Sequence, residues 1–544
     1  MYELAWRDRA IVVLLAMVAS AGFLGAQSSQ EPKPAPPAPS PNGTVSSVQI
    51  QRENVFDKAE RERWLARVMN GLHIVTREPV VAREMLFRQG QPFDSTEFAE
   101  TARNLRKLDV FRAVSVDSAT TDSGLVALVT TRDAWTTQPY ATFKSAGDQI
   151  TWGIGMREKN LLGLGIKAGV RYTSDPDRST TSFTANLPRI LQDRVDFSGS
   201  YDLLSDGERG RFTVAAPYTA LTTPRSASFE WLYDDIDILR FYNGEEAASD
   251  TVRRLMSSVT LRGGRAKKAS RVGYLRTGLA LRARRDDFRD LTEPEIAKAD
   301  RSVFGDLEMS LESSSSKYLV IRGYRNLVMN EDVDLSRTIR VSLWVAPSAL
   351  GYERTGFGPA MTMHTGRQFS KGFTYSDLRA SSLFTSSGLD SGSVAGLAVL
   401  LLHPAPRHAV VFNVNAGMQK NAHPGAEFDL GLTFGPRGFP AHSFTGDRAF
   451  FTTAEYRWLA IPDIMGLVAV GLAGFADYGG AWYSGSPSRT GTDVGIGLRF
   501  GSIRGSATKG ATRIDLAHRF ANDALGAKWV IAIGSGFAFD RPPP

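Results

Sequence analysis

The chain contains no cysteine in its 544 residues. Without a thiol it can form neither a disulfide bond nor a thiolate metal site, and no lipid can be attached to a cysteine behind a signal sequence. Histidine is scarce as well, with seven residues scattered along the chain. Neither a His-Glu-x-x-His nor a Gly-x-Ser-x-Gly motif occurs. We therefore expect no enzyme, no cofactor and no metal site.

Long apolar segments are also missing. A helical membrane protein of this size would carry several apolar runs of roughly 18 residues or more. The one apolar run of note covers residues 10–24, follows a short segment of mixed charge, and is followed by Gly25 and Ala26. This arrangement predicts a secretory signal peptide over residues 1–26, with an uncleaved N-terminal anchor as the alternative.

The chain has a positive net charge, but its basic residues are not clustered in one segment. The formal net charge is +7, from 64 basic and 57 acidic residues. Nucleic-acid binding needs a clustered basic patch, and here lysine and arginine are spread along the chain. We interpret them as charges of a lumen and of loops, and we expect no nucleic-acid partner.

Residues 27–43 form a proline-rich linker. Within residues 31–41, proline recurs at almost every second position. Such a stretch favours an extended, unpacked backbone and acts as a spacer. We expect a tether here rather than a ligand for a proline-binding partner.

Residues 44–133 predict a small mixed α/β module. The Gly-Gln-Pro-Phe sequence at residues 90–93 is typical of a turn, and Asp94 or Ser95 behind it can cap a helix. The apolar residues that follow have helical spacing. The predicted strands cover residues 45–50, 110–116 and 125–131, and the predicted helices cover residues 57–69, 79–87 and 95–108.

From about residue 139 to residue 540, apolar and polar residues alternate. In one clear stretch, Val494, Ile496 and Leu498 share one face, and the other face carries Asp493, Gly495, Gly497 and Arg499. Successive strand residues point to opposite faces. Because charge lies opposite apolar residues in so many segments, a transmembrane barrel with a polar lumen fits better than a soluble β-sandwich. At about 25 residues per strand with its loop, the predicted fold is an all-β transmembrane barrel of about 16 antiparallel strands.

The end of the chain has the pattern of a last barrel strand. Phe537 and Phe539 share a face with Trp529, Ile531 and Ile533. A terminal aromatic residue on an alternating strand resembles the C-terminal signal that bacterial barrels present to their assembly machinery. The prolines behind it cannot extend a ladder of backbone hydrogen bonds, so we expect the strand to stop there.

The alternation also predicts carboxylates inside the barrel. Within residues 450–458, Tyr456 and Trp458 suit the lipid face and its aromatic girdle, which leaves Glu455 pointing inward. The same reasoning turns Asp477 inward on the next strand. Two neighbouring strands therefore offer carboxylates to one lumen.

Arg437 lies on the glycine-rich loop that precedes these two strands. If this loop folds inward, the planar guanidinium group of Arg437 can donate hydrogen bonds to both carboxylates. An unpaired charge at this position would be costly.

Residues 435–439 read Gly-Pro-Arg-Gly-Phe, and residues 475–479 read Phe-Ala-Asp-Tyr-Gly. In this order and spacing, the two motifs resemble those of the BamA/TamA family, in which a long extracellular loop folds into the barrel. The resemblance implies a lumen site with the loop tip Arg437, Gly438 and Phe439 and the partners Glu455, Phe475, Asp477 and Gly479. Pro436 departs from the usual valine.

The N-terminal module resembles a POTRA domain. The resemblance rests on Gly90-x-Pro92-Phe93, on a helix that ends at Leu108, and on Phe111 at the start of an alternating strand. Two departures are the missing Gly-Asn after the first strand and the long insertion at residues 57–71.

A second Arg-Gly-aromatic sequence, Arg322-Gly323-Tyr324, also fits the tip pattern. The family loop precedes about five strands, or roughly 100 to 125 residues. Arg437 has that distance from Phe539, whereas Arg322 lies about twice as far away. We therefore expect an ordinary strand at Arg322, and at residues 330–334 we expect a solvated acidic loop rather than a cation site.

The resemblance implies a factor that assembles or translocates proteins at the bacterial outer membrane, with a laterally opening barrel and a periplasmic N-terminal domain. Its expected partners are outer-membrane lipids and lipopolysaccharide, unfolded or nascent outer-membrane or secreted polypeptides, and periplasmic chaperones or lipoproteins. Two alternatives stay open: a two-partner-secretion-type exporter of a single exoprotein, and a passive outer-membrane channel.

Overall fold

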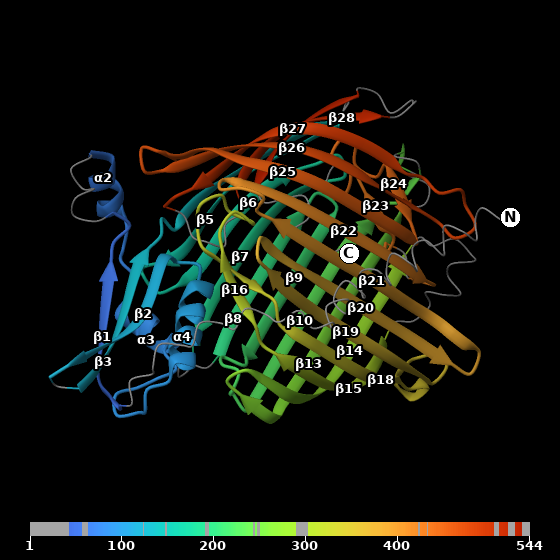
Figure 1. Ribbon diagram of the computed structural model, residues 1–544. Helices are drawn as coiled ribbons and strands as arrows, with labels where there is room; N and C mark the ends of the chain where they lie inside the picture. The colour runs from blue at the N-terminus through green and yellow to red at the C-terminus, as the bar shows by residue number, and fades with distance from the viewer. Residues whose placement is uncertain are drawn as a thin grey trace.

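The computed structural model (Figure 1) describes residues 43–56, 64–122, 124–146, 149–190, 195–242, 245–246, 251–289, 303–422, 425–431, 434–504, 511–520 and 528–535. The predicted signal peptide, the linker before Gly43, Phe537 and Phe539 lie outside these residues. None of the helices in the described segments is long and apolar enough to cross a membrane.

The N-terminal module is a three-stranded sheet covered by short helices. Strand β3 (Gly124–Asp133) lies between β1 (Val45–Glu53) and β2 (Phe111–Thr121), parallel to the first and antiparallel to the second. The helices are α2 (Trp64–Leu72), α3 (Glu78–Glu84) and α4 (Ser95–Lys107). Asp94 caps α4 by accepting a hydrogen bond from the Thr96 backbone N–H, which satisfies one of the free amides of the first turn.

The remaining long strands close into one antiparallel barrel, which has 20 strands in the described segments. They are β4 (Thr137–Ala146), β5 (Gln149–Leu161), β6 (Ile166–Ser174), β7 (Ser179–Arg189), β8 (Val195–Leu204), β9 (Gly207–Ala216), β10 (Arg225–Ile238), β13 (Val252–Ser270), β14 (Gly273–Arg289), β15 (Val303–Ser315), β18 (Arg337–Ala346), β19 (Gly356–Phe369), β20 (Gly372–Thr385), β21 (Gly388–Leu402), β22 (His408–Lys420), β25 (Arg448–Ile464), β26 (Val468–Trp482), β27 (Gly491–Ser502), β28 (Thr512–Phe520) and β29 (Trp529–Ser535).

The predicted barrel is confirmed, but the predicted count of about 16 strands is too low. That count assumed about 25 residues for each strand with its loop. Several connections are much shorter, with two residues between β8 and β9, between β13 and β14, and between β19 and β20. The same length of chain therefore holds more strands.

Side chains on neighbouring positions separate cleanly into an outer and an inner face. Tyr456 and Trp458 are 47% and 42% exposed on the outer face, whereas Glu455 and Arg457 between and beside them are buried. On β27, Ile496 is exposed and Arg499 is buried. An apolar outer surface around a polar interior is the arrangement by which a β-barrel crosses a membrane.

The module lies against one end of the barrel, which we call the module end (Figure 1). Glu84 of α3 forms an ion pair with Arg189 at 3.1 Å. Glu100 of α4 accepts a hydrogen bond from the Leu221 backbone N–H at 2.9 Å. Arg189 ends β7, and Leu221 lies in the turn between β9 and β10, so both mark the module end of the barrel. We call the opposite end the far end.

Two long connections enter the lumen, one from each end. From the far end comes the loop at residues 421–447, which contains the short strands β23 (Phe428–Leu430) and β24 (Phe444–Gly446). From the module end comes the connection at residues 316–336, a hairpin of β16 (Tyr318–Ile321) and β17 (Glu331–Asp334). Two smaller far-end elements are the β11 (Phe241–Tyr242) and β12 (Glu245–Glu246) hairpin and the 3-10 helix η3 (Ser348–Leu350).

The module-end hairpin packs on inward-facing barrel residues. Tyr324, Leu327 and Leu335 belong to a buried cluster with Phe373, Leu401 and Val411. The strand register puts Phe373 opposite Leu401, Leu401 opposite Val411, and Val411 opposite the inward Glu455. The hairpin therefore lies inside the barrel.

This hairpin corrects two predictions. Arg322 does not continue a strand, because β16 ends at Ile321 and Gly323 has a positive φ of 77° in the turn beyond it. Residues 330–334 are not a solvated loop, because Glu331–Asp334 forms β17 and Glu331 is buried. The Glu331 carboxylate accepts hydrogen bonds from the backbone N–H groups of Arg325 and Asn326.

Candidate functional site in the barrel lumen

The tip of the far-end loop is a tight turn between β23 and β24. Gly435 has φ of 127°, a backbone conformation that residues with a side chain rarely adopt, and a Cβ there would lie 3.0 Å from the Gly431 nitrogen. The Phe439 backbone N–H donates to the Pro436 carbonyl at 3.3 Å. This turn directs the Arg437 side chain into the barrel wall.

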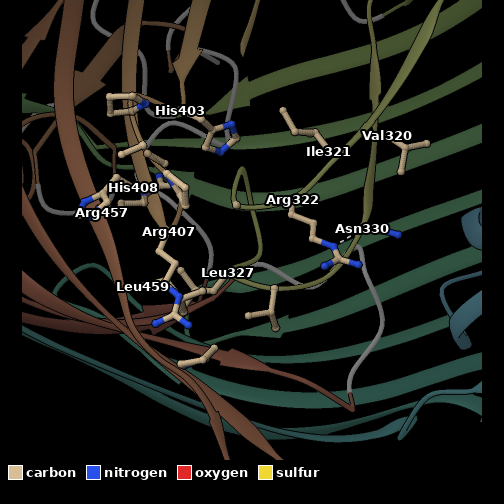
Figure 2. Close-up of a pocket in the computed structure, with 17 residues that line it drawn as sticks. Val320, Ile321, Arg322, Leu327, Asn330, His403, Arg407, His408, Arg457 and Leu459 are labelled. Atoms are coloured by element: carbon tan, nitrogen blue, oxygen red, sulfur yellow. Dashed lines mark hydrogen bonds between the residues drawn. The ribbon is translucent and has the colours of Figure 1, made fainter. Parts of the chain in front are cut away.

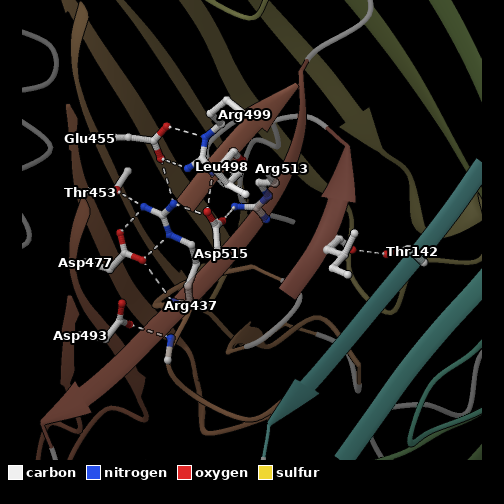
Figure 3. A network of polar contacts seen from close by, with 12 residues as sticks. Thr142, Arg437, Thr453, Glu455, Asp477, Asp493, Leu498, Arg499, Arg513 and Asp515 are labelled. Atoms are coloured by element: carbon white, nitrogen blue, oxygen red, sulfur yellow. Dashed lines mark hydrogen bonds and ion pairs between the residues drawn. The ribbon is translucent and has the colours of Figure 1, made fainter. Parts of the chain in front are cut away.

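Arg437 binds Asp477 and Glu455 at the same time (Figure 3). Its Nε and Nη2 donate to the two oxygens of Asp477 at 2.7 and 2.9 Å, and its Nη1 donates to Glu455 Oε2 at 2.9 Å. Nη2 also donates to the Thr453 hydroxyl at 3.0 Å. Bidentate pairing of this kind fixes the orientation of the guanidinium plane as well as its position.

The face of the Arg437 guanidinium lies 3.5 Å from the centre of the Phe475 ring. Arg437 is 4% exposed, so it is held away from bulk water between an aromatic face and carboxylates. A cation in such a place is stabilised by the ring and by its ion pairs together. The sequence-predicted residues Arg437, Glu455, Phe475 and Asp477 thus lie in direct contact.

Gly438 and Phe439 extend the contact to β27. The Gly438 backbone N–H donates to Asp493 Oδ2 at 2.8 Å. The Phe439 ring is buried against Gly491, where a Cβ would lie 2.1 Å from the ring. Gly491 therefore leaves the space that Phe439 fills.

Gly479 and Gly495 provide room beside the ion cluster, the name used here for Arg437, Glu455, Arg457, Asp477, Arg499, Arg513 and Asp515. A Cβ on Gly479 would lie 2.7 Å from the Phe450 carbonyl oxygen, and one on Gly495 would lie 2.2 Å from the Phe475 ring. Small residues at these inward positions thus relieve crowding in the lumen.

Glu455 is the centre of a larger network. It accepts hydrogen bonds from Arg457 Nε at 2.7 Å and from Arg499 Nη2 at 3.0 Å, in addition to Arg437. Arg499 also donates to Asp515 at 2.6 Å, and Arg513 pairs with the same aspartate at 3.1 Å. These residues come from β25, β27 and β28, so the loop tip is bound to several strands at once.

Sequence reasoning assigned no role to Asp493, Arg499, Arg513 or Asp515. A signal for them existed, because all four are polar residues that alternate with apolar ones on the last strands. The inward-facing argument used for Glu455 and Asp477 would have placed them in the lumen too.

The module-end hairpin reaches the same network. Arg457 Nη1 donates to the Tyr324 backbone carbonyl at 2.5 Å while its Nε binds Glu455. Arg322, by contrast, is exposed and donates to Asn330 at 2.6 Å. Of the two Arg-Gly-aromatic sequences, only the one at Arg437 places its arginine in the ion cluster.

Contacts continue from the hairpin to the module. Arg106 of α4 forms a bidentate pair with Asp332 of β17, at 2.6 and 2.9 Å. The guanidinium of Arg103 lies 4.2 Å from the centre of the Tyr318 ring. A continuous path of contacts therefore runs from α4 through the hairpin and Arg457 to Glu455 and Arg437.

His442 fastens the far-end loop to its neighbours. Its Nε2 contacts Asp177 at 2.9 Å, its Nδ1 contacts Asp429, and its ring stacks on Phe241. Burial alone would lower the pKa of His442, but the hydrogen bonds to the two aspartates outweigh burial and raise the pKa to about 9.

The junction between β4 and β29, the first and last barrel strands that the structure describes, closes the barrel. In the described segments, β29 pairs with β4 through four residue pairs, from Val530–Ala146 to Ile533–Phe143. The next junction, between β28 and β29, has seven. The Thr142 hydroxyl adds one hydrogen bond to the Ile533 carbonyl at 3.0 Å (Figure 3).

No family model and no curated protein matches the sequence. Solved structures similar to this chain include CdiB from Escherichia coli, with 12% identity, a TM-score of 0.45 and coverage of 98% of each chain. BamA from Haemophilus ducreyi, solved without POTRA domains 1–3, has 12% identity and a TM-score of 0.40 over 91% of this chain and 84% of that one. The FrpB iron transporter from Neisseria meningitidis has 8% identity and a TM-score of 0.38 over 79% and 87%. These structural neighbours are outer-membrane barrels, and a likeness this distant assigns no activity.

Proposed function

We propose that this chain is an outer-membrane protein of the BamA/TamA type that inserts or translocates polypeptide substrates. The observation that carries the proposal is the Arg437 loop tip, which is buried in the barrel and held by Asp477 and Glu455. A passive pore does not require an ion cluster that holds a loop inside its lumen. Residues 44–133 then act as a POTRA-like domain in the periplasm, and the module end of the barrel faces the periplasm.

This function would act at the β29–β4 junction, which closes the barrel. An opened junction presents unpaired backbone groups to which a substrate strand can add. The module offers further edges, because β1 and β2 are the outer strands of its sheet. Such a protein guides strand pairing and performs no covalent chemistry.

An exporter of a single exoprotein would use the same parts, so it is the second candidate. A passive channel is less favoured, because hairpin 316–336 and the Arg437 loop both lie within the lumen.

Depletion of the protein in its source bacterium separates these functions. We expect loss of folded forms of several unrelated outer-membrane barrels, restored by the wild-type gene and not by Arg437→Ala. Loss of one secreted protein with normal membrane barrels would identify an exporter. Normal barrels and normal secretion would refute both protein-handling functions.

A further inference from the structure

A cavity of about 810 Å³ opens beside the module-end hairpin (Figure 2). It lies between the hairpin tip and the turn at residues 403–407, which joins β21 to β22. Ala409, Arg457 and Leu459 line its wall from the lumen side of β22 and β25. Its size is in the range of pockets that hold small ligands or a few residues of an extended peptide.

The lining combines apolar walls with positive charge. Val320, Ile321, Leu327 and Leu459 are among the apolar residues, and the positive charge comes from Arg322, Arg407 and Arg457. No carboxylate is among the residues that line the cavity in the described part of the chain. The cavity differs in this respect from the ion cluster, in which every arginine forms an ion pair with a carboxylate.

Two of these arginines have no carboxylate partner. The Arg407 guanidinium makes no hydrogen bond or ion pair with a described residue, and Arg322 donates only to the Asn330 amide oxygen. Arg407 also has a positive φ of 66°, and its carbonyl accepts a hydrogen bond from the Leu459 N–H at 2.8 Å. The turn therefore holds its backbone in an uncommon conformation for a residue with a side chain.

We propose that this cavity receives an acidic, partly apolar segment of an unfolded polypeptide. The inference rests on the proposed function and adds to it a substrate class and an entry site at the module end. The arginines without a carboxylate partner complement the acidic side chains of such a segment. The apolar walls of the cavity contact the apolar residues that lie between these acidic side chains. A polypeptide fits better than a lipid, because Ala409, Arg457 and Leu459 lie on the inner face of the barrel.

Arg457 links this cavity to the loop tip. It lines the cavity and also donates to Glu455, which binds Arg437. An anionic segment bound in the cavity would therefore compete with Glu455 for the Arg457 guanidinium.

The test uses the full chain in lipid nanodiscs and a fluorescent synthetic peptide in which Val and Phe alternate with Glu and Asp. A matched peptide carries Gln and Asn instead. Fluorescence anisotropy is measured for wild type, for Arg322→Gln with Arg407→Gln, and for a control with Arg354→Gln and Arg367→Gln. The control removes the same charge from exposed arginines that do not line the cavity.

We expect the acidic peptide to bind wild type and control alike, and the cavity variant about tenfold more weakly, as the loss of two ion pairs with exposed arginines implies. The amide peptide should bind all three weakly. Equal binding of the acidic peptide to all three proteins would overturn the site but leave the proposed function standing, since that function is judged by barrel assembly in cells. Displacement of the peptide by phosphatidylglycerol vesicles from wild type, but not from the cavity variant, would instead assign the cavity to an anionic lipid and also overturn the proposal.

Discussion

At the scale of single residues, the lumen site depends on burial. Arg437, Glu455 and Asp477 are each at most 4% exposed, so their ion pairs are little screened by water. Removing one partner of such a pair costs more than the pair itself contributes, because the remaining charges stay buried without compensation.

We expect Arg437→Ala to destabilise the barrel by about 3 kcal/mol, reduced where lumen water reaches the carboxylates. The temperature at which the folded band disappears on semi-native gels measures this change. Arg322→Ala is the matched control and should melt as wild type, because Arg322 is exposed and bonds only Asn330. Exchanging the charges of Arg437 and Asp477 should restore part of the loss. An Arg437→Ala protein as stable as wild type would show that the cluster contributes nothing.

His442 gives a pH dependence. Its pKa in the folded protein, about 9, lies above the value of about 6.5 in the unfolded chain. The stabilisation by its bonds to Asp177 and Asp429 is therefore fully present below about pH 6.5 and is lost as the pH rises through about 9. Protease cleavage of the far-end loop should increase over that range in wild type. In His442→Gln it should be high at every pH, and a flat wild-type profile would contradict the assignment.

At the scale of elements, the junction between β29 and β4 makes a direct prediction. Ser145 and Ile531 are register partners there, and the chain has no cysteine of its own. A disulfide between Ser145→Cys and Ile531→Cys should block substrate handling, and a reductant should restore it. The pair Val494→Cys and His518→Cys crosses β27 and β28 in the same way and should leave function intact. Full function of the oxidised Ser145–Ile531 pair would exclude opening at this junction.

The sequence predicted long strands well and short inserted elements poorly. Alternation over eight or more residues identifies a strand and its inward face, which is why Glu455 and Asp477 were expected in the lumen. β16 and β17 have only four residues each, too few for a period to emerge, and they form because they pair with each other beside the buried apolar cluster of the lumen. The sequence predicted Arg437, Glu455 and Asp477 of the ion cluster but not Arg499, for a related reason. The pairing of Arg499 with Glu455 spans 44 residues and depends on which strands become neighbours.

At the scale of the whole molecule, two loops from opposite ends meet within one barrel. Wild type should therefore conduct ions poorly in planar bilayers. Replacing residues 322–330 by a Gly-Ser linker removes Tyr324 and Leu327 from the lumen and should raise the single-channel conductance. Replacing Ser348–Leu350 in the same way is the control, because η3 lies at the far end and buries no residue. Equal conductance of all three proteins would show that the hairpin does not obstruct the lumen.

Because three arginines bind Glu455, these four positions should evolve in a coupled way. Arg437, Arg457 and Arg499 come from a loop and two strands, and each would lose an ion pair with the loss of that one carboxylate, while Arg437 keeps Asp477 and Arg499 keeps Asp515. Substitutions at these positions should become established together in descendant sequences rather than singly. The lipid-facing residues between them, such as Tyr456 and Leu498, can exchange one apolar side chain for another and should drift independently.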